Sequence, residues 1–450
     1  MLTRRDLLRD AGLLGTAAAA GPLLSGCTTG GGRQADPVPA AYTRAGYLRD
    51  DVAALVGSPA SGTTTARSLS AFTTELYAAL SGAGTGATNL VCSPYSVAAG
   101  LAMTRAGARG NTGQEIDHVL HTTGPTALAD GMSRLRLTLD QHTGRRRRLD
   151  QTLGSVSIDA ANSVWAQHGI WWRRAFLLEL AGRYGAGMNL VDFIHAGDAA
   201  AKAINEWTAT TTRGRVKHIV PPGLLDQYTR MVLVNAIWLK APWEEVFDPH
   251  LTKPADFHTA AGARVRVPMM SRDLTHASYA AGPGWQAASL PYAGRDLAMA
   301  IVVPDAVDGL PEVHQAMSGG GLATLLDHLS PHPVVKVAMP RWSFTTSARL
   351  DGPLKQLGMP TAFGEQADFT AMCRDERLRI GAVAHRAFVS VDEHGTEAAA
   401  ATAVVMQAMS GQAGPVPSVR ADRPFVFALY DVPTKLVLFL GRVGDPTVTT

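Results

Sequence analysis

Six short apolar runs in the second half of the chain place the strongest constraint on its fold. They lie between Arg230 and Val443 and read RMVLVNAIWLK, LAMAIVVP, VVKVAMP, HRAFVSVD, RPFVFALYD and KLVLFLGRV. Runs of this length, rich in β-branched and aromatic residues, are typical of β-strands. Helical stretches are found mostly earlier and begin near Ser68, Ser93, Phe176 and Ala200. Helices that come first and strands that come later predict an α+β fold rather than a regular βαβ series.

The composition is that of a large globular protein without a strong charge bias. The chain has 450 residues, of which 46% are hydrophobic and 18% charged, and its formal net charge is +3. Nucleic-acid binding usually needs a concentrated basic face, so we expect no nucleic-acid partner. The one charge run, Arg145–Arg148, is predicted to be a solvated loop, and a polyanion site is the alternative.

The N-terminus has the features of an export signal. Arg4 and Arg5 precede an apolar stretch, Ala11–Leu24, which is interrupted by Gly and Pro and is short for a membrane-spanning helix. This arrangement resembles a twin-arginine signal, and the LSGC that follows resembles a bacterial lipobox. The resemblance implies cleavage before Cys27, a lipid on its sulfur, and a protein held at the outer face of the cell membrane. The alternative is a plain secretory signal in which Cys27 is incidental.

We therefore divide the chain into a signal peptide at residues 1–26, a flexible tether at 27–66 and a single domain at 67–450. The tether is predicted from its content of Gly, Pro, Ser and Thr. With Cys27 set aside, Cys92 and Cys373 remain, so one disulfide is possible but no disulfide framework is indicated. Cys92 is expected to be a small buried hydrophobic residue.

Motifs of catalysis and metal binding are missing from the sequence. GAGTGA, Gly82–Ala87, matches a dinucleotide-binding pattern, but it follows a helix rather than a strand and is predicted to be a loop. There is no GxSxG, HExxH, Walker loop or CxxC, and the 14 histidines show no metal-ligand spacing. We therefore expect no enzyme, no metal site and no cofactor.

Several blocks of sequence, in a fixed order, resemble the serpins, a family of serine protease inhibitors. They include NLVCSPYSVAAGLAMTRAGARGNTGQEI, VLVNAIWLKAPWEEVFDPHLTKPADFH, HRAFVSVDEHGTEAAAATAVV and RPFVFALYDVPTKLVLFLGRVGDP. The resemblance covers about Ser68–Pro446. It implies the serpin fold, with three β-sheets, about eight or nine helices and an exposed reactive loop at about 393–419.

The resemblance also assigns a function to the small-residue stretch that follows Val391. It implies a hinge made of Glu393, Gly395, Thr396, Glu397, Ala398, Ala399, Ala400 and Ala401. In serpins a target protease cleaves the loop and forms an acyl-enzyme, and the loop then inserts into a sheet and traps the protease. The residues here suit insertion, because no proline, charge or bulky ring lies between Ala398 and Thr402. Side chains alternate along a strand, so Thr396, Ala398, Ala400 and Thr402 would share one face.

The length of the family's hinge, counted from Glu393, places the cleaved bond at Met409–Ser410. Ala408–Met409 and Met406–Gln407 are alternatives, because the loop beyond Ser410 is longer than is usual in the family. Methionine suits the apolar pocket of an elastase-, chymotrypsin- or subtilisin-like protease and offers no cation to a trypsin-like pocket. Met409 could instead be a loop residue with no special role.

Other residues are assigned by the same resemblance. Ser93, Ser96, Asn235 and His385 match the family's shutter, a buried polar cluster where the sheet opens, and Trp243 matches the tryptophan where the hinge enters. The alternative is that the four polar residues are hydrogen-bonded core residues without a gating role. Trp243 could likewise be a large core anchor.

We thus expect a lipid-anchored inhibitor whose partners are a serine protease and the membrane, and which acts as a monomer. A non-inhibitory serpin that binds a partner at the cell surface, or is a plain protease substrate, is the alternative. The small-residue hinge favours the inhibitor, because inhibition is what requires insertion.

Overall fold

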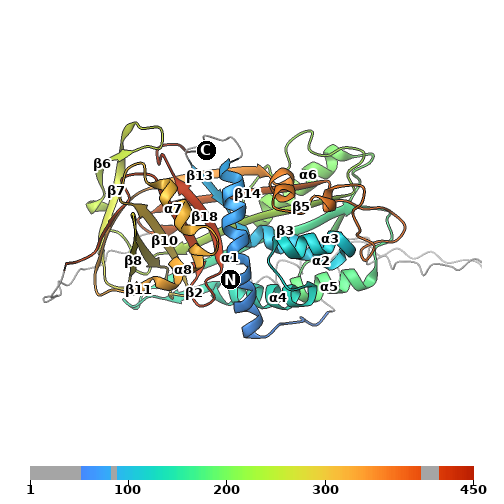
Figure 1. Cartoon of the computed structure of the whole chain (residues 1–450), viewed down its shortest axis with the longest axis horizontal. Helices are drawn as coiled ribbons and strands as arrows, with labels where there is room; N and C mark the ends of the chain where they lie inside the picture. Colours follow the sequence, from blue (N-terminus) through green and yellow to red (C-terminus); the bar gives the residue numbers. More distant parts are fainter. Residues whose placement is uncertain (1–51, 83–88, 397–414, 450) are drawn as a thin grey trace, which may run out of the picture. The chain divides into compact units, whose positions relative to one another are not determined.

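The computed structural model describes residues 52–82, 89–396 and 415–449, which form nine α-helices and three β-sheets (Figure 1). The helices are α1 Pro59–Gly82, α2 Pro94–Gly107, α3 Gly110–Val119, α4 Pro125–His142, α5 Arg174–Tyr184, α6 Gly197–Thr211, α7 Leu310–Met317, α8 Gly321–His328 and α9 Asp351–Gln356. Two short 3-10 helices are η4 Pro249–Leu251 and η5 Thr361–Phe363. The α+β prediction is confirmed.

Each sheet is named here after one of its central strands. The β17 sheet has the order β1 (Leu90–Cys92), β18 (Val437–Val443), β17 (Phe425–Asp431), β10 (Leu297–Pro304), β9 (Trp285–Pro291), β8 (Ser278–Gly282) and β11 (Ser330–Pro331). The β12 sheet has the order β16 (Ser418–Arg420), β12 (Val335–Pro340), β7 (Arg264–Leu274) and β6 (Lys253–His258). The β5 sheet has the order β13 (Trp342–Arg349), β14 (Ala382–Asp392), β15 (Gly395–Thr396), β5 (Met231–Pro242), β3 (Leu153–Gln167) and β2 (Gly144–Arg147), with β4 (Met188–Val191) beside β3.

All six apolar runs form strands. They lie in β5, β10, β12, β14, β17 and β18. Every residue of β10 and β17 is buried, since both strands lie inside the β17 sheet with apolar neighbours on both faces. Strands that are covered on both faces lose the polar alternation of a surface strand and become continuous apolar runs.

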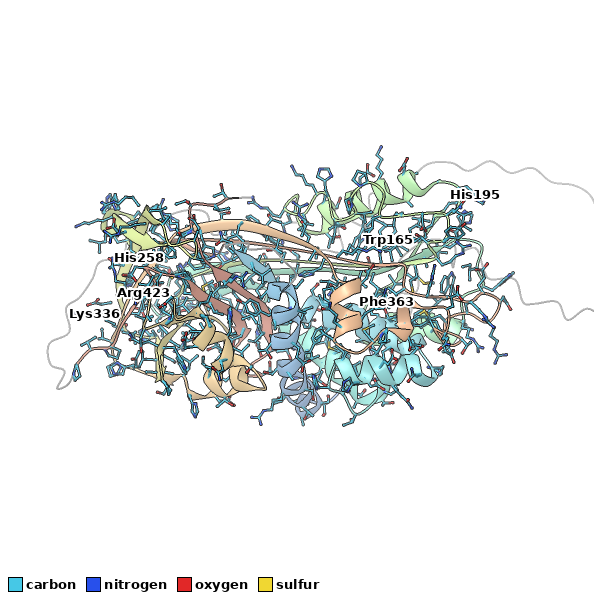
Figure 2. The ribbon with its side chains drawn as sticks, turned by 45° about the horizontal axis from the view of Figure 1, so that its top comes forward. Trp165, His195, His258, Lys336, Phe363 and Arg423 are labelled. Atoms are coloured by element: carbon cyan, nitrogen blue, oxygen red, sulfur yellow. The ribbon has the colours of Figure 1, made fainter. Side chains whose placement is uncertain are left out.

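The β5 sheet lies between two layers of apolar side chains. Leu233 and Ile237 of β5 belong to the main core cluster, which includes residues of α2, whereas Val232 and Val234 belong to a second cluster with Ile204 of α6. On the α6 side, Trp165 of β3, which is labelled in Figure 2, meets Trp207 edge-on, with ring centroids 5.8 Å apart. Helices therefore cover both faces of this sheet.

Helix α2 lies very close to β5. A Cβ atom added at Gly100 would lie 2.3 Å from the side-chain oxygen of Asn235, so only glycine fits at this position. Almost every residue of α2 is buried, which agrees with the small side chains in this part of the sequence.

Two expectations about the chain's organisation need correction. The flexible tether was expected to reach residue 66, but α1 begins at Pro59 and buries Gly62, Thr65 and Ala66. Before the helix, the Leu55 N–H donates to the carbonyl oxygen of Gly182 in α5 (2.9 Å). Tertiary contacts thus order a stretch whose Ser, Thr and Gly content is typical of a linker.

The arginine run is also not a loop. Residues Gly144–Arg147 form β2, in which exposed positions alternate with half-buried ones. Arg145 and Arg147 are exposed, whereas Arg146 and Arg148 are partly buried. Four consecutive charges resemble a solvated segment, but the alternation of the strand turns Arg146 inward, and Arg148, just past the strand, is also partly buried. The GAGTGA motif lies outside the described residues except for Gly82, which ends α1.

Replacement of Gly100 by alanine is expected to destabilise the protein by about 1–3 kcal/mol, because the new methyl group would force α2 and β5 apart. Gly352→Ala in α9 is the matched control, since a Cβ there would meet no atom within 4 Å. Urea denaturation of both variants measures the difference. Equal stability of the two variants would contradict the close approach of α2 to β5.

Candidate functional site

A tight turn at the end of β14 reverses the chain into the two-residue strand β15. Asp392 Oδ1 accepts hydrogen bonds from the backbone N–H groups of His394 (2.8 Å) and Gly395 (3.3 Å), and burial raises the pKa of the Asp392 carboxyl. Gly395 has a φ of +146°, and a Cβ there would lie 2.2 Å from the carbonyl oxygen of Ala241. A side chain cannot be accommodated there, so the expected pivot lies where only glycine fits.

Strand β15 lies between β14 and β5 at one end of their contact. Thr396 pairs with Val391 of β14 and with Ala241 of β5, antiparallel to both. Further along, β14 and β5 pair directly and in parallel, from Ala382–Val232 to Ala387–Ile237. The two long strands therefore separate beyond Ala387 and Ile237, and β15 occupies the open end of the wedge between them.

Trp243 forms the floor of the hinge. Its indole stacks on the ring of Tyr292, with centroids 4.6 Å apart, and its Nε1 donates to the carbonyl oxygen of Asp392 (2.9 Å). Its backbone N–H donates to the carbonyl oxygen of His394 (2.9 Å). The Tyr292 hydroxyl, whose pKa is raised by burial, lies 2.6 Å from the hydroxyl of Thr396. Trp243 is 1% exposed, so it is a core anchor that also contacts the hinge.

Glu393 is fixed by an ion pair. Its carboxylate accepts hydrogen bonds from Arg341 Nε (2.7 Å) and from the hydroxyl of Thr252 (2.5 Å), and the residue is 3% exposed. Burial acts to raise the pKa of Glu393, but the bonds from Arg341 and Thr252 hold it below its usual value. The hinge is thus fixed on both sides of its turn, by Glu393 and by Thr396.

The predicted shutter residues come together at the N-terminus of α2. Ser93 caps the helix by accepting a bond from the Ser96 N–H (3.2 Å), and its own N–H donates to His385 Nε2 of β14 (3.1 Å). The Ser96 hydroxyl donates to the side chain of Asn162 in β3 (2.6 Å). Helix α2 is therefore bonded to strands on both sides of β5.

Asn235 lies in the middle of this row. Its neighbours across the sheet are Asn162 of β3 and His385 of β14, and it is 0% exposed. Neither polar atom of its amide group has a hydrogen-bond partner among the described residues. The amide faces Gly100 of α2, where the close approach of the helix leaves no room for a side chain.

The comparisons with known proteins agree with this geometry. A family model described as serpin (serine protease inhibitor) matches residues 67–446. The chain belongs to the serpin family. It is 34% identical to a leukocyte elastase inhibitor of Sus scrofa, over 83% of this chain and 97% of that protein. A serpin-like protein of Thermococcus kodakarensis is 35% identical, over 84% and 85% of the two chains. The structure of serpin48 from Tenebrio molitor superimposes with a TM-score of 0.73 and 28% identity, over 85% of this chain and 98% of that one.

Membership explains the lack of catalytic motifs, because serpins are protease inhibitors rather than catalytic enzymes. Among the described residues no group of His, Cys, Asp and Glu is arranged to hold a metal ion. Cys92 and Cys373 are both free and buried, and burial raises the pKa of Cys92 to about 12. Cys92 is thus the buried residue that was expected, and the possible disulfide does not form between the two.

Part of the predicted site lies outside the described residues. This holds for the hinge residues from Glu397 to Ala401, for Met409 and Ser410, and for Arg4, Arg5 and Cys27. No helix in the described ranges is both long and apolar enough to cross a membrane.

Sequence reasoning missed several contacts of the predicted hinge and shutter residues. They involve Arg341, Thr252, Tyr292, Asn162 and the hairpin that joins β2 to β3. Arg148 of the hairpin donates from Nε to the carbonyl oxygen of Trp243 (2.8 Å), and Glu244 accepts from the N–H groups of Leu149 (2.5 Å) and Gly294 (3.2 Å). Trp243, just after β5, thus binds the turn at His394 through its backbone N–H, and it binds Arg148 of the hairpin through its carbonyl oxygen. The four identical arginines show no alternation in the sequence, so nothing in the run indicates this contact.

The free energy of unfolding of this serpin is expected to decrease as the pH is lowered, because of His385. Burial lowers the pKa of His385 to about 4, whereas an unfolded histidine has a pKa of about 6.5. The unfolded chain therefore takes up this proton first, and stability is lost as pH falls from about 6.5 towards 4. The loss is on the order of 3 kcal/mol.

Urea denaturation at several pH values measures this loss, and His385→Gln is expected to lack that part of it. His195→Gln is the control, since this histidine side chain is 77% exposed. His314, whose pKa burial also lowers to about 4, contributes equally to all three proteins. Equal pH slopes for the wild type and His385→Gln would contradict the buried neutral state of His385.

Proposed function

We propose that this serpin is a suicide-substrate inhibitor of elastase-, chymotrypsin- or subtilisin-like serine proteases. Cleavage of its reactive loop leads to insertion of the loop between β14 and β5, and the acyl-enzyme is trapped. The observation that carries the proposal is the position of β15 at the open end of the wedge between these strands. A strand that grew from Thr396 would run into that wedge.

The register of β15 specifies where each added residue would go. Continued past Thr396, it would place Ala398 beside Leu239 of β5 and Val389 of β14. The same register would place Thr402 between Asn235 and His385, which now face each other across the sheet. Small residues from Ala398 to Ala401 suit this path. A threonine hydroxyl at position 402 would offer the unsatisfied Asn235 amide a hydrogen-bond partner.

Insertion would release enough free energy to compete with completion of the protease reaction. Each new ladder hydrogen bond contributes about 1 kcal/mol net. A dozen inserted residues would therefore release on the order of 10 kcal/mol, comparable with the stability of a whole domain. The loop must insert before water releases the acyl group from the protease serine. The inhibitor therefore needs a fast path into the sheet and no catalytic group of its own.

The class of target follows from the residue before the cleaved bond. Met409–Ser410 remains the proposed bond, and an unbranched apolar methionine suits the pockets of the three protease types. The similarity to a leukocyte elastase inhibitor supports the same choice. We also propose that the protein acts as a monomer, since one chain contains both the loop and the sheet that receives it.

The soluble domain is expected to form an adduct with elastase-, chymotrypsin- or subtilisin-like proteases that survives denaturing electrophoresis, and none with a trypsin-like protease. Thr402→Arg is expected to abolish the adduct and to leave clean cleavage in the loop, because insertion would bury a charge between Asn235 and His385. Thr402→Ser is the control and should retain the adduct. Cleavage of the wild type without an adduct would refute the trap and favour a non-inhibitory serpin.

We propose further that the protein is exported and lipid-anchored at the outer face of the membrane, with Arg4 and Arg5 in the export signal and Cys27 as the lipidated residue. The order of the two signals in the sequence supports this.

The Cys27→Ser variant is expected to lose the lipid and to leave the membrane fraction, because the proposed anchor is the acyl chain on that sulfur. Fractionation of cells that express both proteins tests this, with Cys92→Ser as the control. Equal membrane retention of Cys27→Ser and the wild type would overturn the assignment.

A further inference from the structure

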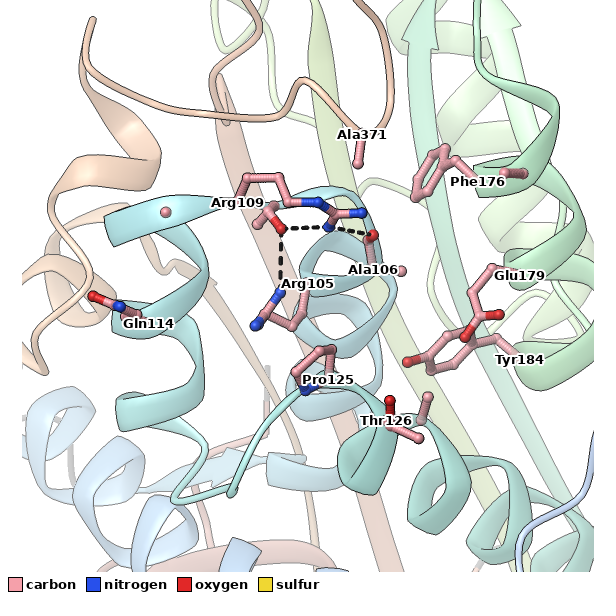
Figure 3. Close-up of a pocket in the computed structure, with 14 residues that line it drawn as sticks. Arg105, Ala106, Arg109, Gln114, Pro125, Thr126, Phe176, Glu179, Tyr184 and Ala371 are labelled. Atoms are coloured by element: carbon pink, nitrogen blue, oxygen red, sulfur yellow. Dashed lines mark hydrogen bonds between the residues drawn. The ribbon is translucent and has the colours of Figure 1, made fainter.

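A hollow of about 550 Å³ lies where the end of α2 and the starts of α3 and α4 meet α5 (Figure 3). None of the hinge or shutter residues lines it. Its volume is within the range of pockets that hold small molecules. The side chains that surround it include both positively and negatively charged groups, and apolar side chains form its floor.

One wall is positively charged. The guanidinium groups of Arg105 and Arg109 converge on the carbonyl oxygen of Ala108, at 3.2 and 2.8 Å. Arg105 also forms two hydrogen bonds of 2.8 Å to the carboxylate of Asp117. In the described parts of the chain no carboxylate forms an ion pair with Arg109, although Asp368 lies near enough for Arg109 to help lower the pKa of its carboxyl. The first turn of α3 begins beside it at Gly110 without a side-chain cap, which adds partial positive charge to this wall.

The facing wall is negatively charged. Glu179 of α5 forms an ion pair with Arg183 (2.8 Å), and Arg183 forms a second ion pair with Asp130. Two carboxylates thus share one guanidinium, so a negative charge remains on this side. Figure 3 shows Arg109 and Glu179 projecting from different walls of the hollow.

Apolar and aromatic groups lie between the two walls. Phe176 and Ala129 are buried beneath the hollow, each 3% exposed. The hydroxyl of Tyr184 donates to the carbonyl oxygen of Ala102 (3.1 Å), which leaves the ring as an apolar surface, and burial raises the pKa of Tyr184. An aromatic ligand could pack against these rings.

We propose that this hollow binds a small zwitterion with an apolar side chain, of the class of the aromatic α-amino acids. The ligand's carboxylate contacts Arg109 and the start of α3, its ammonium group contacts Glu179, and its ring lies on Phe176 and Tyr184. A simple anion or cation would satisfy one wall and leave the other unmatched. This site does not depend on the inhibitory function proposed above.

Three probes that share one ring test the proposal by calorimetry or ligand-observed NMR: L-phenylalanine, 3-phenylpropanoate and phenethylamine. We expect saturable binding of L-phenylalanine, about tenfold tighter than that of either single-charge probe. Arg109→Gln should reduce the affinity for L-phenylalanine to that for phenethylamine. Glu179→Gln should reduce it to that for 3-phenylpropanoate.

Arg145→Gln and Glu312→Gln make the same charge changes at exposed positions elsewhere and should leave binding unchanged. Ala175→Trp on α5 fills the hollow without a change of charge and should abolish binding of all three probes. Absence of saturable binding by L-phenylalanine, equal affinities for the three probes, or unchanged binding by Ala175→Trp would each overturn the proposal. If either charge variant fails to fold, Ala175→Trp and the ranking of the probes decide.

Discussion

The antiparallel pairing of β15 with its two neighbours is the interaction on which the rest of the site depends. Among the described residues Gly395 and Thr396 take part in it, and they lie between β14 and β5 at one end of the contact between these strands. The surrounding contacts hold this short strand in place: the Asp392 turn on one side, and Trp243 and Tyr292 beneath it. Strand β15 thus lies inside the sheet, in the gap between β14 and β5, and not at either edge.

Helix α2 provides the opposing restraint. Its N-terminus is bonded through Ser93 to β14 and through Ser96 to β3, so separation of β14 from β5 has to change these contacts. Gly100 allows the helix to lie directly on β5, where the Asn235 amide has no hydrogen-bond partner among the described residues. The same helix ends beside the charged hollow at Arg105, so a single element connects the shutter to the proposed zwitterion site.

The sequence predicted those features that depend on local patterns, and it failed where distant segments meet. The six strands were predictable because strands buried on both faces are continuous apolar runs, and Gly395 because a reversal after an acidic turn needs glycine. The family resemblance supplied the shutter residues, which the structure brings together. The partners of Glu393 were not predictable, because Arg341 and Thr252 reach it from connections between other elements, and only the topology sets those distances. The arginine run was predicted to be a solvated loop because of its charge. In the structure it forms a strand, in which exposed and half-buried positions alternate.

The place of the C-terminal strands has a consequence for the protein after proteolysis. Any cut between Thr396 and Pro415 divides the chain into two polypeptides, and the shorter one contains β16, β17 and β18. β17 and β18 lie inside the seven-stranded β17 sheet, between β10 and β1, and almost all their residues are buried. The short piece therefore has no route out of the fold that does not dismantle a core sheet. A cleaved molecule is thus a two-chain complex held together like a complemented pair of fragments, and its two pieces separate only when the whole domain unfolds.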